Sequence, residues 1–301
     1  RGPQVFDTAD IGDFVIRRSD GTPAFFFCNA LDDALMGVTL VVRGEDHLTN
    51  TPRQLLLLEA LGLPLPAYAH IALVVGDDGA PLSKRSGSKS VEELRESGYL
   101  PAALYNYLAR LGHTYEDNAL LSLDQLAAGF AVERLHRAPA RFDETQLRHW
   151  QREAVLHAPV ETVWGWMGAA AHRLVPAASR DAFIECVRGN LLVPADALHW
   201  ARIVFDDASV LNHPANEAAQ AAGGGFFAAA LKALEQHGTD FKSLAETLKA
   251  ATGETGKALY QPLRAALTGE FDGPEMAKLL PLIGLERARA AGKIRKMKIP
   301  P

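Results

Sequence analysis

The sequence is poor in cysteine, has no long apolar run and carries no excess of positive charge. Its two cysteines, Cys28 and Cys186, stand far apart in the 301-residue chain and lack the paired spacing of a zinc site, which fits a reduced protein. No segment approaches the roughly 20 apolar residues that span a bilayer. With 31 basic and 36 acidic side chains the net charge is -5, so any nucleic-acid contact must come from local patches. These absences predict a reduced, cytoplasmic protein with no zinc and no membrane partner.

Three regions of different pattern follow one another along the chain. Up to about Leu65, "DFVIRRSDGTPAFFF" predicts two strands around a turn, "VTLVVR" predicts a buried strand, and "TPRQLLLLEALGL" predicts a helix with Thr51 as N-cap. One further strand, "HIALVV", precedes a region in which most segments are predicted to be helical. Beyond Pro159 the chain is Ala-rich with helical apolar spacing, and "AAQAAGGGFF" at 218–227 is predicted to be a loop between helical sub-bundles. The predicted fold class is therefore α/β followed by all-α.

Polar residues follow the predicted strand within "VVRGEDHLTNTPRQ", residues 41–54. Arg43 stands at the carboxyl end of that strand, and Asp46 and His47 follow after a Gly-Glu turn. Ligands of open α/β sheets bind beyond the carboxyl ends of strands, where an arginine can bind a carboxylate or phosphate through two hydrogen bonds. Taken alone, such a turn is more often a cluster of surface ion pairs.

Two other stretches carry candidate residues. In "PAFFFCNALDD", residues 23–33, core packing is expected for the three phenylalanines, and Asn29 is the predicted ligand contact. In "GDDGAPLSKRSGSKS", residues 76–90, a glycine-flanked loop offers Lys84 as a point charge and Arg85 as a fork for phosphate oxygens. The loop lacks the spacing of a P-loop. Its composition alone favours a solvated turn, but its place after a strand allows it to face the same pocket as Arg43.

The order of several motifs resembles bacterial glutamyl-tRNA synthetases, which are class I enzymes. The text from "DFVIRRSDG" to "LLLLEALG" is similar to the second half of their catalytic domain, and "PLSKR" is similar to the second class signature, Lys-Leu-Ser-Lys-Arg in this family. Downstream, "GYLPAALYNYLARLGH" resembles the start of the helical stem-contact domain, and "QPLRAALTGEFDGPEMAKLLPLIG" at 261–284 resembles the anticodon-binding terminus. The resemblance runs from about Asp13 to Arg289.

This resemblance implies the second half of a Rossmann-like catalytic domain, a helical stem-contact domain and a helical anticodon-binding domain. The expected boundaries place the end of an acceptor-binding insertion at 1–18, the catalytic part at 19–65, the stem-contact domain with the LSKR loop at 66–158 and the anticodon-binding domain at 159–301. The implied reaction is the ATP-dependent attachment of L-glutamate to tRNA through glutamyl-adenylate. The implied substrates are tRNA(Glu), L-glutamate and ATP with Mg²⁺, in a monomeric enzyme, with tRNA(Gln) as an open alternative.

The resemblance also assigns residues to these roles. Those expected to serve phosphate chemistry are Ser83, Lys84 and Arg85 of the loop, together with Asp46 and His47 for ATP. Those expected to hold the amino acid are Arg43 for its side-chain carboxylate, Asn29, and Phe25, which stands where the family has a tyrosine. Pro81 stands where the signature has its first lysine, which removes a charge and stiffens the entrance of the loop.

The first class signature, His-Ile-Gly-His or close to it, is absent from this sequence. We therefore expect the chain to be the C-terminal part of a glutamate–tRNA ligase and incomplete for catalysis. The alternative is a non-catalytic tRNA-binding paralogue or regulatory module. A glutaminyl-specific relative is a further alternative, although the helical terminus argues against it.

Overall fold

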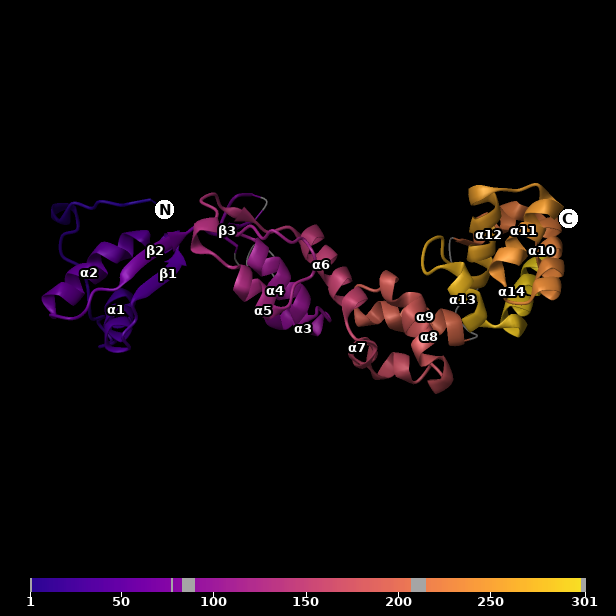
Figure 1. The fold of residues 1–301 in the computed structure, drawn as a ribbon, viewed down its shortest axis with the longest axis horizontal. Coiled ribbons are helices and arrows are strands. Elements are labelled where there is room, and N and C mark those ends of the chain that lie inside the picture. The colour runs from indigo at the N-terminus through magenta and orange to yellow at the C-terminus, as the bar shows by residue number, and fades with distance from the viewer. Residues whose placement is uncertain (1, 77, 83–89, 207–214, 299–301) are drawn as a thin grey trace. The chain divides into compact units, whose positions relative to one another are not determined.

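The structure is a computed structural model that describes residues 2–76, 78–82, 90–206 and 215–298, without the side chains of 215–218, 220 and 292–298. Its contacts divide the chain into two compact units, the first formed by residues 1–90 and 104–147 and the second by residues 91–103 and 148–301. Figure 1 shows the order of the elements. Within the described residues no helix combines the length and apolar character needed to cross a membrane.

The first unit combines short parallel strands with helices. Its strands are β1 (Leu40–Gly44), β2 (Ala67–Ile71), β3 (Val74–Val75) and β4 (Ala140–Arg141), and its helices are α1 (Phe25–Leu35), α2 (Thr51–Ala60) and α5 (Leu123–Gly129), with the 3-10 helix η2 (Glu45–Asn50) before α2. β1 pairs in parallel with β2, and β3 pairs in parallel with β4. Because α2 connects the parallel strands β1 and β2, this segment is a βαβ unit. The α/β part of the predicted fold class is confirmed.

The phenylalanine run was predicted to be a strand, and this prediction is wrong. Phe25 begins α1, after a turn at Arg18–Gly21 and a single antiparallel bridge between Arg17 and Pro23. Tertiary packing decides the outcome, because Ala30 and Ala34 lie one turn apart on α1 and pack with Leu58 of α2. The phenylalanines that begin α1 are less buried than expected, and Phe25 is 47% exposed.

The strand and helix around the Arg-Gly-Glu-Asp turn also differ in detail from expectation. β1 forms at the predicted place, but Leu40 and Val42 are 49% and 45% exposed, so it is not a buried strand. α2 begins at Thr51 with Asn50 as N-cap, and the predicted capping role of Thr51 is therefore wrong. The helix ends where Gly62 takes a positive φ of 66°, a left-handed conformation that favours glycine.

The second unit is helical. Its helices are α3 (Val91–Glu96), α7 (Val160–His172), α8 (Arg180–Val187), α9 (Pro194–Phe205), α10 (Ala215–His237), α11 (Phe241–Thr252), α12 (Gly256–Thr268), α13 (Met276–Ile283) and α14 (Leu285–Lys298). α4 (Pro101–Arg110) and α6 (Glu144–His157) carry residues of both units. The segment at 218–227 was predicted to be a loop, but it lies inside α10, where the helix breaks only at Gly223 with a φ of 76°.

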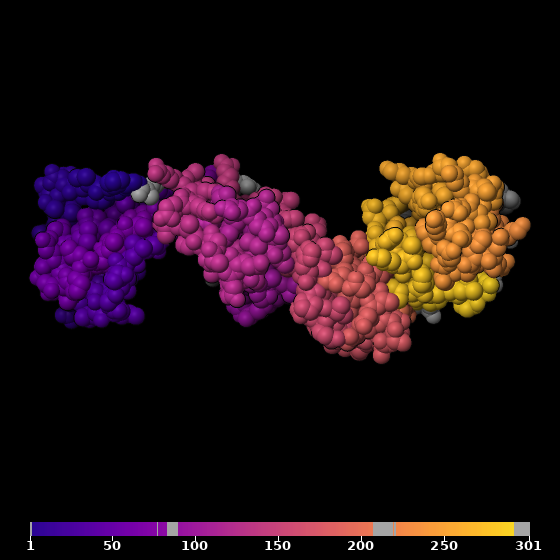
Figure 2. Space-filling view, viewed as in Figure 1, coloured from indigo at the N-terminus to yellow at the C-terminus, as the bar shows by residue number. Residues whose placement is uncertain are grey.

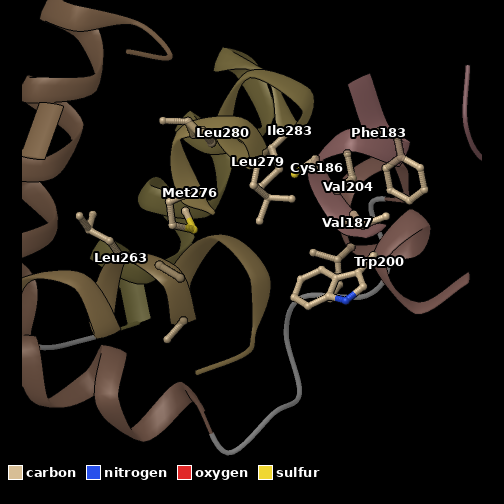
Figure 3. Close-up of a cluster of buried hydrophobic side chains, with 14 of the residues drawn as sticks. Phe183, Cys186, Val187, Trp200, Val204, Leu263, Met276, Leu279, Leu280 and Ile283 are labelled. Atoms are coloured by element: carbon tan, nitrogen blue, oxygen red, sulfur yellow. The ribbon is translucent and has the colours of Figure 1, made fainter. Parts of the chain in front are cut away.

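A continuous apolar core holds the helices of the second unit together. Part of it is drawn in Figure 3, where Phe183 and Val187 of α8 and Trp200 of α9 gather near Leu279 and Ile283 of α13. The fully buried side chains in this core include Phe183, Ile184, Leu248 and Leu279. Because α8 and α13 are far apart in sequence, burial of their shared apolar face brings two distant segments of the unit together.

Candidate functional site

Arg43 lies near the carboxyl end of β1, opposite His70 in the register of the parallel pair β1–β2. Strand residues two apart face the same side, so Tyr68 and His70 of β2 share a side. The ring of Tyr68 lies 4.9 Å from the guanidinium carbon of Arg43, within the range of a cation–π contact. The sheet therefore places one arginine between a phenol and an imidazole.

The guanidinium of Arg43 is held at several points. Its Nη2 donates to Thr51 Oγ1 at 2.7 Å and to the backbone oxygen of His47 at 3.4 Å, and its Nε donates to His70 Nε2 at 3.4 Å. Burial lowers the pKa of Arg43, and the charges of Asp33 and Asp46 oppose that change. A guanidinium remains a cation through such a shift. Its Nη1 is buried and has no hydrogen-bond partner among the described residues.

Burial in the same environment changes the pKa values of both His70 and Tyr68. Burial, followed by the charge of Arg43, lowers the pKa of His70, so its imidazole is neutral at pH 7. Burial raises the pKa of Tyr68, whose hydroxyl has no partner among the described residues. His70 Nε2 also lies 2.9 Å from Thr51 Oγ1. Thr51, His70 and Arg43 thus form one hydrogen-bonded group.

Asn29 is fixed by a glutamine from the neighbouring helix. Gln54 of α2 is fully buried, and its Nε2 donates to Asn29 Oδ1 at 3.0 Å and to the backbone oxygen of Phe26 at 3.2 Å. The amide oxygen of Asn29 is therefore already used, and its Nδ2 remains as the group that can donate to a ligand.

The other predicted residues in this region surround His47. The ring of Phe25 lies 5.3 Å from the ring of His47, and Asp46 Oδ2 lies 3.7 Å from His47 Nε2. Gly44 lets the carboxylate of Asp46 approach the backbone closely, because a Cβ at position 44 would require that carboxylate to move. The structure thus links Phe25, Asp46 and His47 to Arg43 through contacts, and Asn29 lies on the adjoining helix α1.

Open space lies beside Thr51, Tyr68 and His70, whereas none of the predicted site residues Phe25, Asn29, Arg43, Asp46 and His47 lines it. A cavity of about 570 Å³ is lined by residues of the segment 2–11 and by Thr51, Tyr68 and His70, among others. Figure 2 shows that segment, in the darkest indigo, lying against the part of the chain that carries α1 and α2. A pocket of this size is in the range of small-molecule sites.

The loop predicted to contact phosphate lies outside the described residues at Ser83, Lys84 and Arg85. Before the loop, the described residues 74–76 and 78–82 pair with one another in an antiparallel manner. Gly76 N donates to Ala80 O at 2.9 Å, Leu82 N donates to Val74 O at 3.3 Å, and Pro81 forms a bridge with Val75. Pro81 therefore lies at the end of a paired segment, directly before the loop.

Sequence reasoning missed four residues of the group: Thr51 as a hydrogen-bond partner, Gln54, Tyr68 and His70. Gln54 lies on a helix for which the sequence predicted no polar contact, Thr51 was expected only as the N-cap of that helix, and His70 opens the strand predicted for "HIALVV". One signal was present, because a polar residue within the apolar run "HIALVV" requires a buried partner.

Two family descriptions match the chain. Residues 1–149 match "tRNA synthetases class I (E and Q), catalytic domain", and residues 171–291 match "Anticodon binding domain". Among curated proteins, Glutamate--tRNA ligase 2 of Nitrosococcus oceani is 62% identical over 96% of this chain, and Glutamate--tRNA ligase 1 of Methylococcus capsulatus is 55% identical over 95%. The chain spans 61% and 62% of the length of these two relatives.

Solved structures give a similar result. A glutamate tRNA ligase from Elizabethkingia meningosepticum, in complex with its amino acid, aligns with 97% of this chain and 64% of its own at a TM-score of 0.79 and 25% identity. A glutamate-tRNA synthetase from Elizabethkingia anophelis aligns with 95% of this chain and 62% of its own at a TM-score of 0.76 and 25% identity.

Proposed function

Because this chain belongs to the glutamate–tRNA ligase family of class I aminoacyl-tRNA synthetases, we propose that it is part of an enzyme that attaches L-glutamate to tRNA. The proposed reaction has two steps. The α-carboxylate of glutamate attacks the α-phosphate of ATP, which forms glutamyl-adenylate and releases pyrophosphate. A hydroxyl of the terminal adenosine of tRNA then takes the glutamyl group, and AMP leaves.

The observation that carries this proposal is the state of Arg43. It is a half-buried cation at the carboxyl end of a strand, and its buried Nη1 has no partner among the described residues. A buried charged group is costly unless it is paired. A substrate carboxylate supplies the missing partner, and we assign Arg43 to the side-chain carboxylate of glutamate.

The neighbouring residues complete the proposed amino-acid site. Asn29 offers its Nδ2 because Gln54 occupies its Oδ1. Phe25 contributes a ring without a hydroxyl, so its place in the site supplies packing and no hydrogen bond. Asp46 and His47, which follow β1 in the 3-10 helix η2, are assigned to ATP binding.

The loop supplies the charges for the phosphates in this proposal. Lys84, with Ser83 and Arg85 beside it, neutralises negative charge that grows on phosphate oxygens, since catalysis of this type depends mainly on orientation and electrostatic stabilisation. ATP enters with Mg²⁺ as a substrate. The proposed partner is tRNA(Glu), with tRNA(Gln) as a second acceptor to be tested, and the enzyme acts as a monomer in the cytoplasm.

The role of Arg43 is tested in the ligase that contains this sequence. Arg43→Lys keeps a charge but loses the planar fork and the contact with Thr51, so we expect KM for glutamate to rise at least tenfold and KM for ATP to stay within about twofold. Arg53→Lys on α2 is the matched control, because Arg53 contacts the backbone of Thr49 and the ring of Phe14 instead. An unchanged KM for glutamate in Arg43→Lys refutes the assignment.

Binding of tRNA is tested with the chain itself. We expect it to bind tRNA(Glu) more tightly than an unrelated tRNA, with an affinity that falls as salt increases. Equal affinities for both tRNAs across salt concentrations mean non-specific attraction. Specific binding together with a ligase that never charges tRNA would instead support the non-catalytic tRNA-binding module, which the names of the relatives do not favour.

A further inference from the structure

The hydrogen bonds around Arg43 leave one end of its guanidinium, the buried Nη1, without a partner among the described residues. The group has five N–H donors. Its Nε is directed at His70 and its Nη2 at Thr51 and the backbone of His47, whereas Nη1 has no partner among the described residues. The orientation of Nη1 is therefore set by the groups that hold Nε and Nη2.

The other hydrogen bonds of Thr51 determine whether Thr51 or His70 donates the proton in the hydrogen bond between them. Its Oγ1 accepts a hydrogen bond from Arg43 Nη2 at 2.7 Å, so its single proton must point elsewhere. The nearest acceptor is His70 Nε2 at 2.9 Å, and the alternative, the backbone oxygen of His47, is 3.4 Å away. The shorter distance favours donation to His70.

Two donors thus converge on one nitrogen of His70. Both Thr51 Oγ1 and Arg43 Nε point at His70 Nε2, and a nitrogen can accept them only with its lone pair. A proton on Nε2 would lie against the N–H of Arg43 Nε and would release Thr51 to turn toward His47. The network therefore requires a neutral imidazole with its proton on Nδ1.

We propose that His70 is a positioning residue of the carboxylate site: its neutral imidazole holds Arg43, directly and through Thr51, in the orientation that leaves Nη1 for the substrate. This inference rests on the proposed function for the identity of the substrate. The arrangement of His70, Thr51 and Arg43 is a property of the chain itself and is tested without catalysis.

The surroundings of His70 support a neutral state. The charged or titratable groups that face it among the described residues include Arg43 of β1, His47 of η2 and Tyr68 on its own strand. Burial and the charge of Arg43 lower the pKa of His70 below its ordinary value of 6.5. Protonation at lower pH places a second cation beside Arg43 and removes the acceptor. We therefore expect the site to weaken on acidification, while the carboxylate of glutamate stays ionised above about pH 5.

The first experiment measures the protonation of His70 in the chain by NMR of ¹⁵N-labelled histidine. The signals of His70 are assigned as those missing from His70→Gln. We expect the tautomer with the proton on Nδ1 and a pKa below 6.5, and we expect that pKa to rise in Arg43→Met, which removes the neighbouring charge. A proton on Nε2 at pH 7.5, or a pKa that Arg43→Met leaves unchanged, overturns the proposal.

The second experiment measures tRNA charging by the ligase that contains this sequence. In His70→Gln an amide oxygen can accept in place of Nε2 and does not titrate, whereas His70→Leu has no acceptor. At pH 7.5 we expect KM for glutamate to rise roughly tenfold in His70→Leu, the loss of about one hydrogen bond to a charged group, and to stay within about threefold in His70→Gln. His157→Gln on α6, an exposed histidine paired with Glu153, is the matched control.

The pH dependence separates positioning from a merely structural role. Between pH 5.5 and 7.5 the wild-type KM for glutamate should rise as the pH falls, and that of His70→Gln should stay flat. Equal rises in KM for glutamate and ATP in His70→Leu, or the same pH profile in wild type and His70→Gln, refute positioning by His70. If the NMR result is as expected but no variant or wild type charges tRNA with glutamate, the proposed function fails and the role of His70 toward Arg43 stands.

Discussion

Gln151 is the residue whose replacement should destabilise the second unit most clearly. It is fully buried on α6, where its Nε2 donates to Gly98 O at 3.2 Å and Leu192 O at 2.9 Å, and its Oε1 accepts from Leu100 N at 2.9 Å. Gln151→Leu removes all three hydrogen bonds with little change in volume. Gly98 O keeps a second donor, Trp166 Nε1 at 2.6 Å, so the variant leaves two backbone groups without their partner.

The expected cost follows from these two groups. A buried polar group left without a partner costs about 1–3 kcal/mol, so two cost about 4 kcal/mol together, and burial of the leucine recovers part of this. We expect unfolding free energy to fall by about 3 kcal/mol, which at an m-value of about 2 kcal/mol/M moves the urea midpoint by about 1.5 M. Tryptophan fluorescence measures it selectively, because all four tryptophans of the chain lie in the second unit.

The control for this prediction is another glutamine of the same helix. Gln146 is exposed, so Gln146→Leu should change the midpoint very little. A loss below about 1 kcal/mol in Gln151→Leu would mean that the two backbone groups find other partners, and it would refute the reasoning.

Three further predictions concern packing and reactivity. Gly273→Ala should lower the urea midpoint measured by tryptophan fluorescence, because Gly273 has a φ of 144° and a Cβ there would collide with the ring of Trp200; an unchanged midpoint contradicts this. Leu58→Ala should destabilise the first unit by about 2–5 kcal/mol, since Leu58 is fully buried, and hydrogen exchange of β1 and β2 measures the loss. Burial raises the pKa of Cys186 to about 11, so at pH 8 a thiol reagent should modify Cys28 and leave Cys186 intact until urea unfolds the chain; equal rates in the native chain would refute this.

The family resemblance read from the sequence is confirmed by the relatives and by both family matches. It depended on short contiguous motifs, such as "VVRGEDH" and "PLSKR". Such motifs can be recognised in the sequence without knowledge of the tertiary structure. The expected domain boundaries and the roles of Arg43, Asn29, Phe25, Asp46 and His47 stay predictions. The same holds for Ser83, Lys84 and Arg85, which lie outside the described residues.

The sequence by itself determined the order of α/β and helical regions, the place of β1 and the position of Arg43 at its end, because apolar periodicity and turn residues act over a few positions. Only the tertiary structure decided that the phenylalanine run begins a helix, since packing of Ala30 and Ala34 on Leu58 outweighs local strand preference. Likewise, His70 stands 27 positions from Arg43 and meets it only through the register of two parallel strands. Pairing of this kind depends on the whole βαβ unit, so no local pattern could reveal that a histidine and a threonine hold the arginine of the site.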